Sequence, residues 1–164
     1  MGLQEQVMAS RSWVQKAGEW IPGFRGYYAR EHRRDADRLL REAVCARLKS
    51  AADVLGERSA DLARQRRIDE VEALQRLSQR LASAGDRIRT AAQGYSGFFD
   101  AVKVLEPELD RLYAQDQRLF RTAEDLKAAA AKGELDAMTR EASALEAALD
   151  ARKEVLLDLS QVGG

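Results

Sequence analysis

The sequence predicts an all-α fold: an antiparallel up-down bundle of about four long helices, preceded by an N-terminal amphipathic helix. Three observations predict it. Residues that favour helices dominate the chain, and only two of its 164 residues are proline. Apolar residues recur at steps of three and four, which is the period of a helix. Short glycine-containing breaks separate these stretches, and short connections make consecutive helices antiparallel neighbours.

The first expected helix covers residues 1–21, within an N-terminal unit of residues 1–22 that precedes a bundle of residues 23–164. Its apolar side chains fall on one arc, with Trp13 and Trp20 at the edges of that arc. Pro22 ends the helix, because the residue before a proline avoids the α region. The sequence leaves three positions open for this helix: docked on its own bundle, on a protein partner or on a membrane surface.

A glycine–aromatic motif occurs twice, each time where a long periodic stretch begins. The copies are Gly23-Phe24-Arg25-Gly26-Tyr27-Tyr28 and Gly94-Tyr95-Ser96-Gly97-Phe98-Phe99. The glycines permit sharp backbone turns, and paired rings can close the end of a bundle. We therefore expect a structural role for Gly23, Gly26, Gly94 and Gly97.

Four long helices follow, expected at residues 27–66, 68–93, 98–131 and 134–161. Gly56 could mark a bend in the first of them. Pro107 fits best in a first helical turn, so a new or kinked helix is expected after Leu105. Gly133 is a helix-cap signal. The predicted core stripes contain Ala29, Ala36, Leu40, Val44, Leu48, Ala51, Leu55, Leu62, Leu74, Leu77, Leu81, Ala84, Ile88, Ala91, Val102, Leu105, Leu109, Leu112, Leu119, Ala123, Leu126, Leu135, Met138, Ala142, Leu145, Leu149, Leu156 and Leu159.

Helix length adds one expectation about shape. At about 1.5 Å per residue, the helix of residues 27–66 is longer than its successor by roughly 20 Å. We expect this excess to lie at its start, so that residues 27–38 overhang the next helix and need a partner, for which the N-terminal helix is the candidate.

The net charge is zero, but it is unevenly distributed. Residues 1–92 hold 18 Lys and Arg against 13 Asp and Glu, and residues 93–164 hold 9 against 14. We expect the two halves to pack together and neutralise each other, with a bipolar surface for a charged partner as the alternative. The single cysteine, Cys45, indicates a reducing, cytoplasmic setting and is expected to be buried or half-buried.

The residue pattern predicts no catalytic constellation, no metal site and no cofactor. His32 is the only histidine, so neither a zinc site nor the Glu-x-x-His pairs of di-metal bundles can be assembled. Phosphate-binding loops and nucleophile elbows are absent as well. The expected protein is therefore not an enzyme.

Asp116 is the one carboxylate that interrupts an apolar stripe. A buried carboxylate is unfavourable unless it is paired and hydrogen-bonded. The arginine-rich segment of residues 30–38 offers several guanidinium groups, so we expect a structural bond between Asp116 and an arginine there. A solvated cleft is the alternative, and an enzyme site near Asp116 is the last possibility.

The same arginine-rich segment could bind phosphate, with aromatic residues stacking on bases. Interleaved acidic residues at helical spacing and the neutral net charge make nucleic acid an unlikely partner. A protein partner or self-association is the leading expectation, with a membrane surface as the second. The candidate partner-binding residues are Trp13, Trp20, Phe24, Tyr27, Tyr28, Arg30, Arg33 and Arg34.

The segment from Ile21 to Asp37, with its Ile-Pro-Gly-x-x-Gly-Tyr opening, resembles a family of uncharacterised bacterial all-helical proteins. A second block from Gly94 to Tyr113 extends the resemblance, which brings no assigned activity. A looser analogy exists to phage-shock and ESCRT-III-like proteins, which place an amphipathic helix before a long helical hairpin. The expected function is a non-enzymatic bacterial scaffold or adaptor in the cytoplasm, with a peripheral position at the inner membrane as the alternative.

Overall fold

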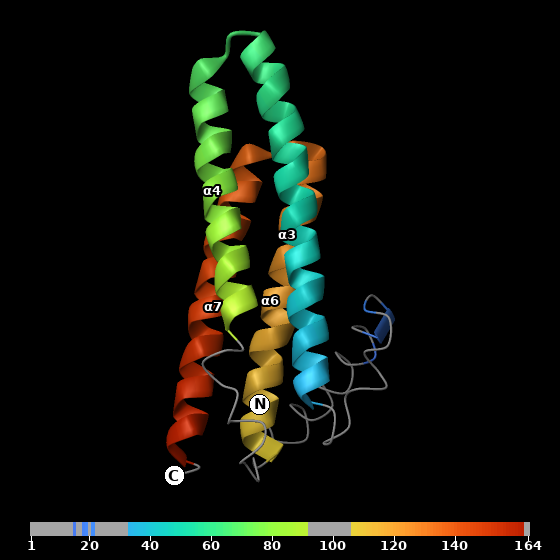
Figure 1. Ribbon diagram of the computed structural model, residues 1–164, viewed down its shortest axis with the longest axis vertical. Coiled ribbons are helices and arrows are strands. Elements are labelled where there is room, and N and C mark those ends of the chain that lie inside the picture. Colours follow the sequence, from blue (N-terminus) through green and yellow to red (C-terminus); the bar gives the residue numbers. More distant parts are fainter. Residues whose placement is uncertain (1–14, 16–17, 20, 22–32, 92–105, 163–164) are drawn as a thin grey trace.

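Four helices packed against one another make up the protein, and no strand occurs among the described residues. This computed structural model describes residues 15, 18, 19, 21, 33–91 and 106–162 (Figure 1). The helices are α3 (Arg33–Arg64), α4 (Ile68–Thr90), α6 (Glu106–Lys132) and α7 (Leu135–Val162). The all-helical prediction is confirmed. Most of the expected N-terminal helix and both glycine–aromatic motifs lie outside the described residues.

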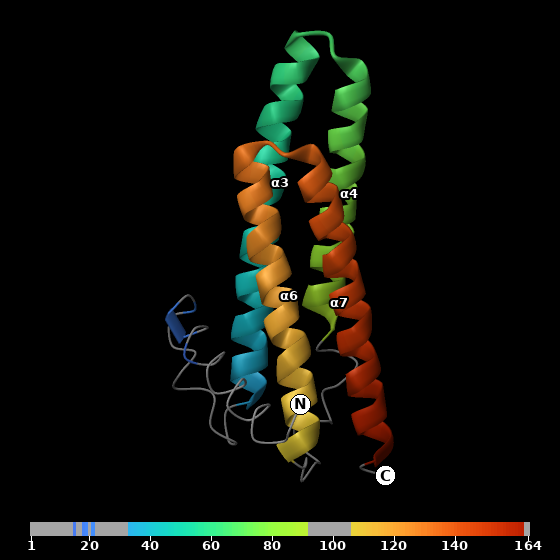
Figure 2. The same cartoon turned by 180° about the vertical axis from the view of Figure 1, so that it is seen from behind.

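The helices form two pairs, each joined by a short turn. The pair α3–α4 lies in front of the pair α6–α7 in Figure 1, and Figure 2 shows the same stack from behind. Between the pairs, α3 packs mainly on α6 and α4 mainly on α7. Across the bundle, α4 therefore packs mainly on α7 rather than on α6, the next described helix along the chain.

The predicted apolar stripes form the core. Every predicted core residue whose side chain is described is buried, except Ala91 at the end of α4 and Leu135 at the start of α7, which are half-buried. The stripe positions lie three or four residues apart, so each helix presents one continuous apolar face. Helix α3 continues through Gly56 as one element, and α6 begins at Glu106, which places Pro107 in its first turn as predicted. The sequence pattern missed Phe120, Ala148 and Val155, which are also buried.

Both turns use the same hydrogen-bonded cap. In the α6–α7 turn, the Gly133 amide donates to the Ala130 carbonyl and the Glu134 amide to the Ala129 carbonyl, both at 3.1 Å. This is a Schellman motif, and Gly133 has the left-handed φ of 72° that the motif requires.

The α3–α4 turn repeats this geometry with an arginine in the glycine position. The Arg66 amide donates to the Ala63 carbonyl and the Arg67 amide to the Leu62 carbonyl, both at 3.0 Å. Arg66 therefore carries a φ of 60°, a conformation that disfavours any residue with a Cβ atom.

We expect Arg66→Gly to raise the free energy of unfolding by about 1 kcal/mol, because glycine adopts this backbone conformation without the Cβ clash. Chemical denaturation with circular dichroism measures the change. The reciprocal control is Gly133→Ala, which should be destabilising, since an added Cβ would also overlap the Arg58 guanidinium. Equal stability of the wild type and both variants would contradict the role assigned to the two turns.

The α3–α4 pair projects beyond the α6–α7 turn (Figures 1 and 2). Gly133 lies against the side chain of Arg58, so α3 passes the α6–α7 turn there. The buried stripe of α4 begins only at Leu74. We call residues 59–73, between these two points, the arm. Its tip exposes Ile68, which is 56% accessible.

At the other end of this pair, the start of α3 extends past the end of α4, as expected for residues 33–38 (Figures 1 and 2). Arg41 already lies beside Arg89, close to the end of α4 at Thr90. The described start of α3 lies beside α6, whose own start reaches further down in both views. Residues 27–32 lie outside the described part.

Ion pairs between the helix pairs join the basic first half to the acidic second half. Arg80 on α4 donates two 3.0 Å hydrogen bonds to Glu146 on α7, and this fork raises the arginine's pKa. Arg87 pairs with Asp150 between the same helices, and Arg47 on α3 pairs with Glu124 on α6. The expectation that the halves neutralise each other is confirmed for these described contacts.

Candidate functional site

The side chains of Asp116 and Arg152 form a buried ion pair across α6 and α7. The Arg152 Nε donates to Asp116 Oδ1 at 2.5 Å, and each side chain is only 6% accessible. Both residues occupy positions of the apolar stripes, so the helical period turns both charges toward the bundle interior. Burial without a partner would be unfavourable for either charge, and the pair satisfies both.

The described partner of Asp116 is an arginine of α7, which the sequence pattern did not predict. The side chains of residues 30–37, where the partner was expected, lie outside the described ones, so that bond stays a prediction. The sequence contained the signal, because Arg152 interrupts the α7 stripe as Asp116 interrupts that of α6. The short turn at Gly133 brings α6 and α7 together, so an acidic residue and a basic residue at stripe positions of these two helices are expected to pair.

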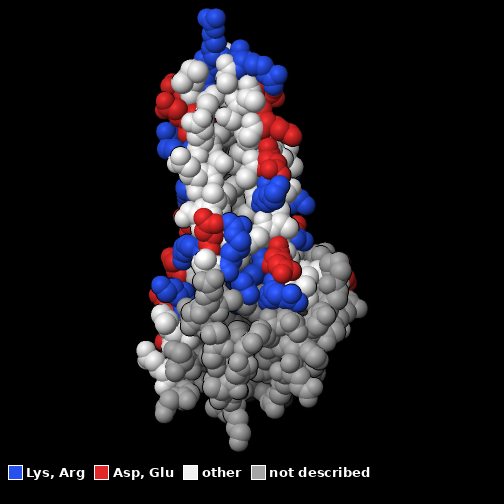
Figure 3. Space-filling view, in the orientation of Figure 1, with Lys and Arg blue, Asp and Glu red and all other residues white. Residues whose placement is uncertain are grey.

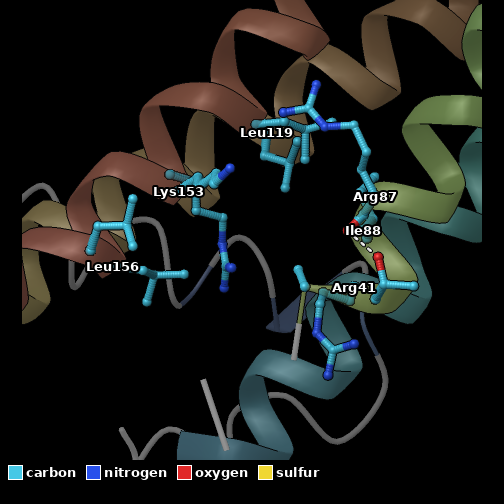
Figure 4. A pocket seen from close by; sticks show the side chains of 11 residues that line it. Arg41, Arg87, Ile88, Leu119, Lys153 and Leu156 are labelled. Carbon is cyan, nitrogen blue, oxygen red and sulfur yellow. Dashed lines mark hydrogen bonds between the residues drawn. The ribbon is translucent and has the colours of Figure 1, made fainter. Parts of the chain in front are cut away.

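A cavity of about 420 Å³ opens beside this pair, with walls from all four helices (Figure 4). Its apolar wall includes Ile88, Leu119, Leu149 and Leu156, which are buried side chains of the core. Its charged lining consists of Arg41, Arg87, Arg152 and Lys153, with no acidic residue among the described residues that line it. We call this space the cationic cavity.

A second concavity of about 780 Å³ runs along α3 and α4. We call it the outer groove; its described lining is Arg38, Arg41, Glu42, Cys45, Ala46, Leu48, Lys49, Ala52, Ser78, Leu81, Ala82, Gly85 and Arg89. In Figure 3, which faces this helix pair, uncharged side chains run up the middle of its upper part between charged ones of both signs, and charged side chains also lie across its lower part. The described lining of the groove combines small residues with four cations and one acid.

Two cross-helix contacts stabilise the outer groove. The Arg41 guanidinium donates to the Arg89 carbonyl at 3.4 Å, and the Cys45 thiol lies 3.8 Å from the Gly85 carbonyl. Cys45 is half-buried, as the sequence predicted. Burial raises the pKa of its thiol, and the opposing effect of Arg89 and Arg41 is smaller.

We expect iodoacetamide at pH 8 to modify Cys45 roughly tenfold or more slowly in the folded protein than in urea, because the thiolate is disfavoured and access needs local opening. The raised pKa also makes the free energy of unfolding depend on pH. The stabilising contribution of the neutral Cys45 thiol is complete below the usual thiol pKa and is lost as the pH rises through the pKa of the folded state. Mass spectrometry of timed samples measures the rate. An exposed control is Ala60→Cys in a Cys45→Ala background, and equal rates for the two thiols would contradict the burial argument.

The predicted partner-binding residues are only partly placed. Trp13, Trp20, Phe24, Tyr27, Tyr28 and Arg30, together with Gly23, Gly26, Gly94 and Gly97, lie outside the described residues. Arg33 and Arg34 form the first turn of α3. Ile21 is described and belongs to the buried core cluster, with 3% of its surface accessible.

Other kinds of site were sought in the same described residues. Groups of three or more histidine, cysteine, aspartate or glutamate side chains suited to a metal ion are absent there. Nor is any described helix both long and apolar enough to cross a membrane. In comparisons with known proteins, no family model, no curated protein and no solved structure matches the chain.

Proposed function

We propose that this protein is a non-enzymatic scaffold or adaptor that acts by protein–protein interaction, and that a helix of a partner protein occupies the outer groove. The single observation that carries this proposal is the composition of the groove. Small side chains line the groove where an incoming helix would contact it, and the described lining holds four cations and one acid.

The small residues matter because they set how closely two helices can approach. Helices pack with their axes about 8–10 Å apart, and the lower end of this range requires small side chains at the contact. Ala46 and Ala52 on α3 and Ala82 and Gly85 on α4 all line the groove. An incoming helix could therefore contact both helices of the pair at once.

The charged residues of the outer groove indicate the chemistry of the partner. Arg38, Arg41, Lys49 and Arg89 belong to the described lining of the groove, in which Glu42 is the one acid. Each of these cations also has contacts of its own, Lys49 with Asp53 and Arg89 with Asp86 among them. A helix with acidic residues beside its apolar face complements this surface. Residues 1–22 hold two basic and two acidic residues, so the chain's own N-terminal segment lacks that charge.

The remaining sequence predictions extend the proposed interaction surface. We propose an up-down antiparallel course within each helix pair, which the short turns support. We also propose that residues 1–21 form an amphipathic helix that docks on the bundle through Ile21, which is buried in the core. The aromatic residues Trp13, Trp20 and Tyr27 would then lie on the surface of the bundle. We propose that the protein acts in the cytoplasm.

The test uses a photo-crosslinking amino acid at Ala82 in the groove, with Ala128 on α6 as an equally exposed control position. Adducts specific to position 82 should converge on one acidic-flanked helical peptide. A synthetic copy of this peptide should bind the purified protein, and the double variant Arg38→Glu/Lys49→Glu should weaken its binding at least tenfold, whereas Lys127→Glu should not.

Three results would overturn the proposal. These are equal adducts at positions 82 and 128, adducts confined to a second copy of the chain or to its own residues 1–22, and peptide binding that ignores the charge reversal. Capture by lipid vesicles in place of a peptide would favour a peripheral membrane function.

A further inference from the structure

We propose that the turn at the tip of the arm is a proteolytic processing site. An endopeptidase that cuts after arginine hydrolyses the bond between Arg66 and Arg67 there and leaves a two-chain protein that stays folded. This inference goes beyond the interaction proposed above, because the described lining of the outer groove contains no residue of the arm. It stands on three observations: accessible arginines, a turn with little packing around it, and a core that both products share.

The tip of the arm presents arginine side chains to solvent. The three residues 65–67 connect α3 to α4. Arg64, Arg66 and Arg67 are all exposed, and Figure 3 shows basic side chains gathered at the upper end of this helix pair. Among the described contacts, Arg67 pairs with Glu70 at 2.5 Å, and no hydrogen bond or ion pair involves the side chain of Arg66. Arg66 is therefore the arginine best placed to enter the specificity pocket of a protease.

The backbone of this turn is held by few interactions. Proteases bind the chain around the cut bond in an extended form, so the turn must unravel first, and exposed loop tips do so most easily. Arg66 has a φ of 60°, and leaving this conformation relieves the contact of its Cβ atom. Among residues 59–73, all of them described, Leu62 is the only buried side chain and Val71 is half-buried. Unravelling the tip therefore gives up little packing.

The α6–α7 turn is a matched comparison, because it also carries an exposed basic residue. Lys132 precedes Gly133 there, and proteases of the trypsin class cut after lysine as well as after arginine. This turn, however, lies against the Arg58 side chain of α3. The helices on its two sides bury Ala130 and Met138, which are 2% and 0% accessible. Unravelling this turn exposes core side chains, so we expect it to resist a protease that cuts the arm.

The cut itself needs only water and the protease. The bond between the carbonyl carbon of Arg66 and the nitrogen of Arg67 breaks, the oxygen of water enters the new carboxylate, and the nitrogen becomes a new amino terminus. The product 1–66 holds α3, and the product 67–164 holds α4, α6 and α7. Helix α3 packs on both α4 and α6, and the buried apolar core contains residues of both products. This packing survives the cut, so the two chains stay associated.

Limited digestion of the full chain with trypsin at pH 8 tests the proposal, with intact-mass spectrometry of timed samples. We expect cutting after Arg66 to be roughly tenfold or more faster than cutting after Lys132, because the cleavage rate follows the population of the open form when a turn opens and closes rapidly. The nicked protein should elute as one species in gel filtration, keep its helical circular dichroism, and separate into the two fragments in urea.

Variants separate the need for arginine from the opening of the turn. Arg64→Gln/Arg66→Gln/Arg67→Gln should abolish the tryptic cut within residues 59–73, whereas subtilisin, which needs no basic residue, should still cut the variant there. Lys132→Gln is the matched control and should leave the cut after Arg66 unchanged. Equal rates of cutting after Arg66 and Lys132, fragments that separate without urea, or resistance of residues 59–73 to subtilisin would overturn the proposal.

Discussion

Asp116→Leu is expected to lower the free energy of unfolding by about 3–5 kcal/mol, one of the two largest effects among the single substitutions that we consider. The leucine itself suits the apolar stripe of α6. The loss comes from Arg152, whose side chain stays 6% accessible and loses the carboxylate that neutralises it. An uncompensated buried charge is far less favourable than either a matched pair or an apolar contact.

The double variant Asp116→Leu/Arg152→Met separates this explanation from simple loss of packing. Removing both charges should restore the stability to near the wild-type value or above it, because a buried ion pair contributes little relative to well-packed apolar residues. The measurement is a double-mutant cycle by urea unfolding. Asp158→Asn, at the exposed Arg111–Asp158 pair, is the control and should change stability by less than about 1 kcal/mol. A double variant as unstable as Asp116→Leu would contradict the argument.

Phe120→Ala should lower the free energy of unfolding by about 3–5 kcal/mol through lost burial and the cavity left behind. The ring is completely inaccessible, and the Arg47 guanidinium lies 4.4 Å from its centroid. Arg47 is held there by its ion pair with Glu124 on α6 and by a 3.0 Å hydrogen bond to the Ala43 carbonyl. The ring thus packs between α3 and α6 with a cation over its face.

Phe120→Leu and Arg47→Met divide this effect into its parts. Leucine retains most of the apolar volume, so it should be less destabilising than alanine by about 2 kcal/mol. Arg47→Met removes the cation over the ring and keeps a chain of similar length, with an expected loss of about 1 kcal/mol. Urea unfolding monitored by circular dichroism gives all three values. A loss below 1 kcal/mol in Phe120→Ala would show that the ring does not hold α3 to α6.

The sequence could predict the parts of this fold that depend on local signals, such as helical periodicity and helix-ending residues. The stripe from Leu40 to Leu55 identified a core face because helical periodicity is a local property of the chain. Gly133 marked its turn for the same reason. The α3–α4 turn is less obvious, since its left-handed position is Arg66, a residue that gives no cap signal.

The candidate site was harder to predict, because it depends on which helices are neighbours. The sequence singled out Asp116 as a buried carboxylate but did not identify Arg152 on α7 as its partner. The packing of α4 on α7 also brings Arg87 to the same cavity as Arg152 and Lys153, and no periodicity encodes that contact. Phe120 escaped prediction because it lies beside the stripe position of Leu119, and its ring packs under Arg47.

The arm has a consequence for the dynamics of the bundle. Between residues 59 and 73, Leu62 is the buried apolar side chain, whereas the body of the bundle buries a layer from all four helices. Separating the two helices of the arm exposes little apolar surface and breaks no hydrogen bond inside either helix. The molecule therefore has two levels of stability, with the arm opening far more often than the body. A partner that binds the arm would stabilise the less stable of these two parts of the molecule.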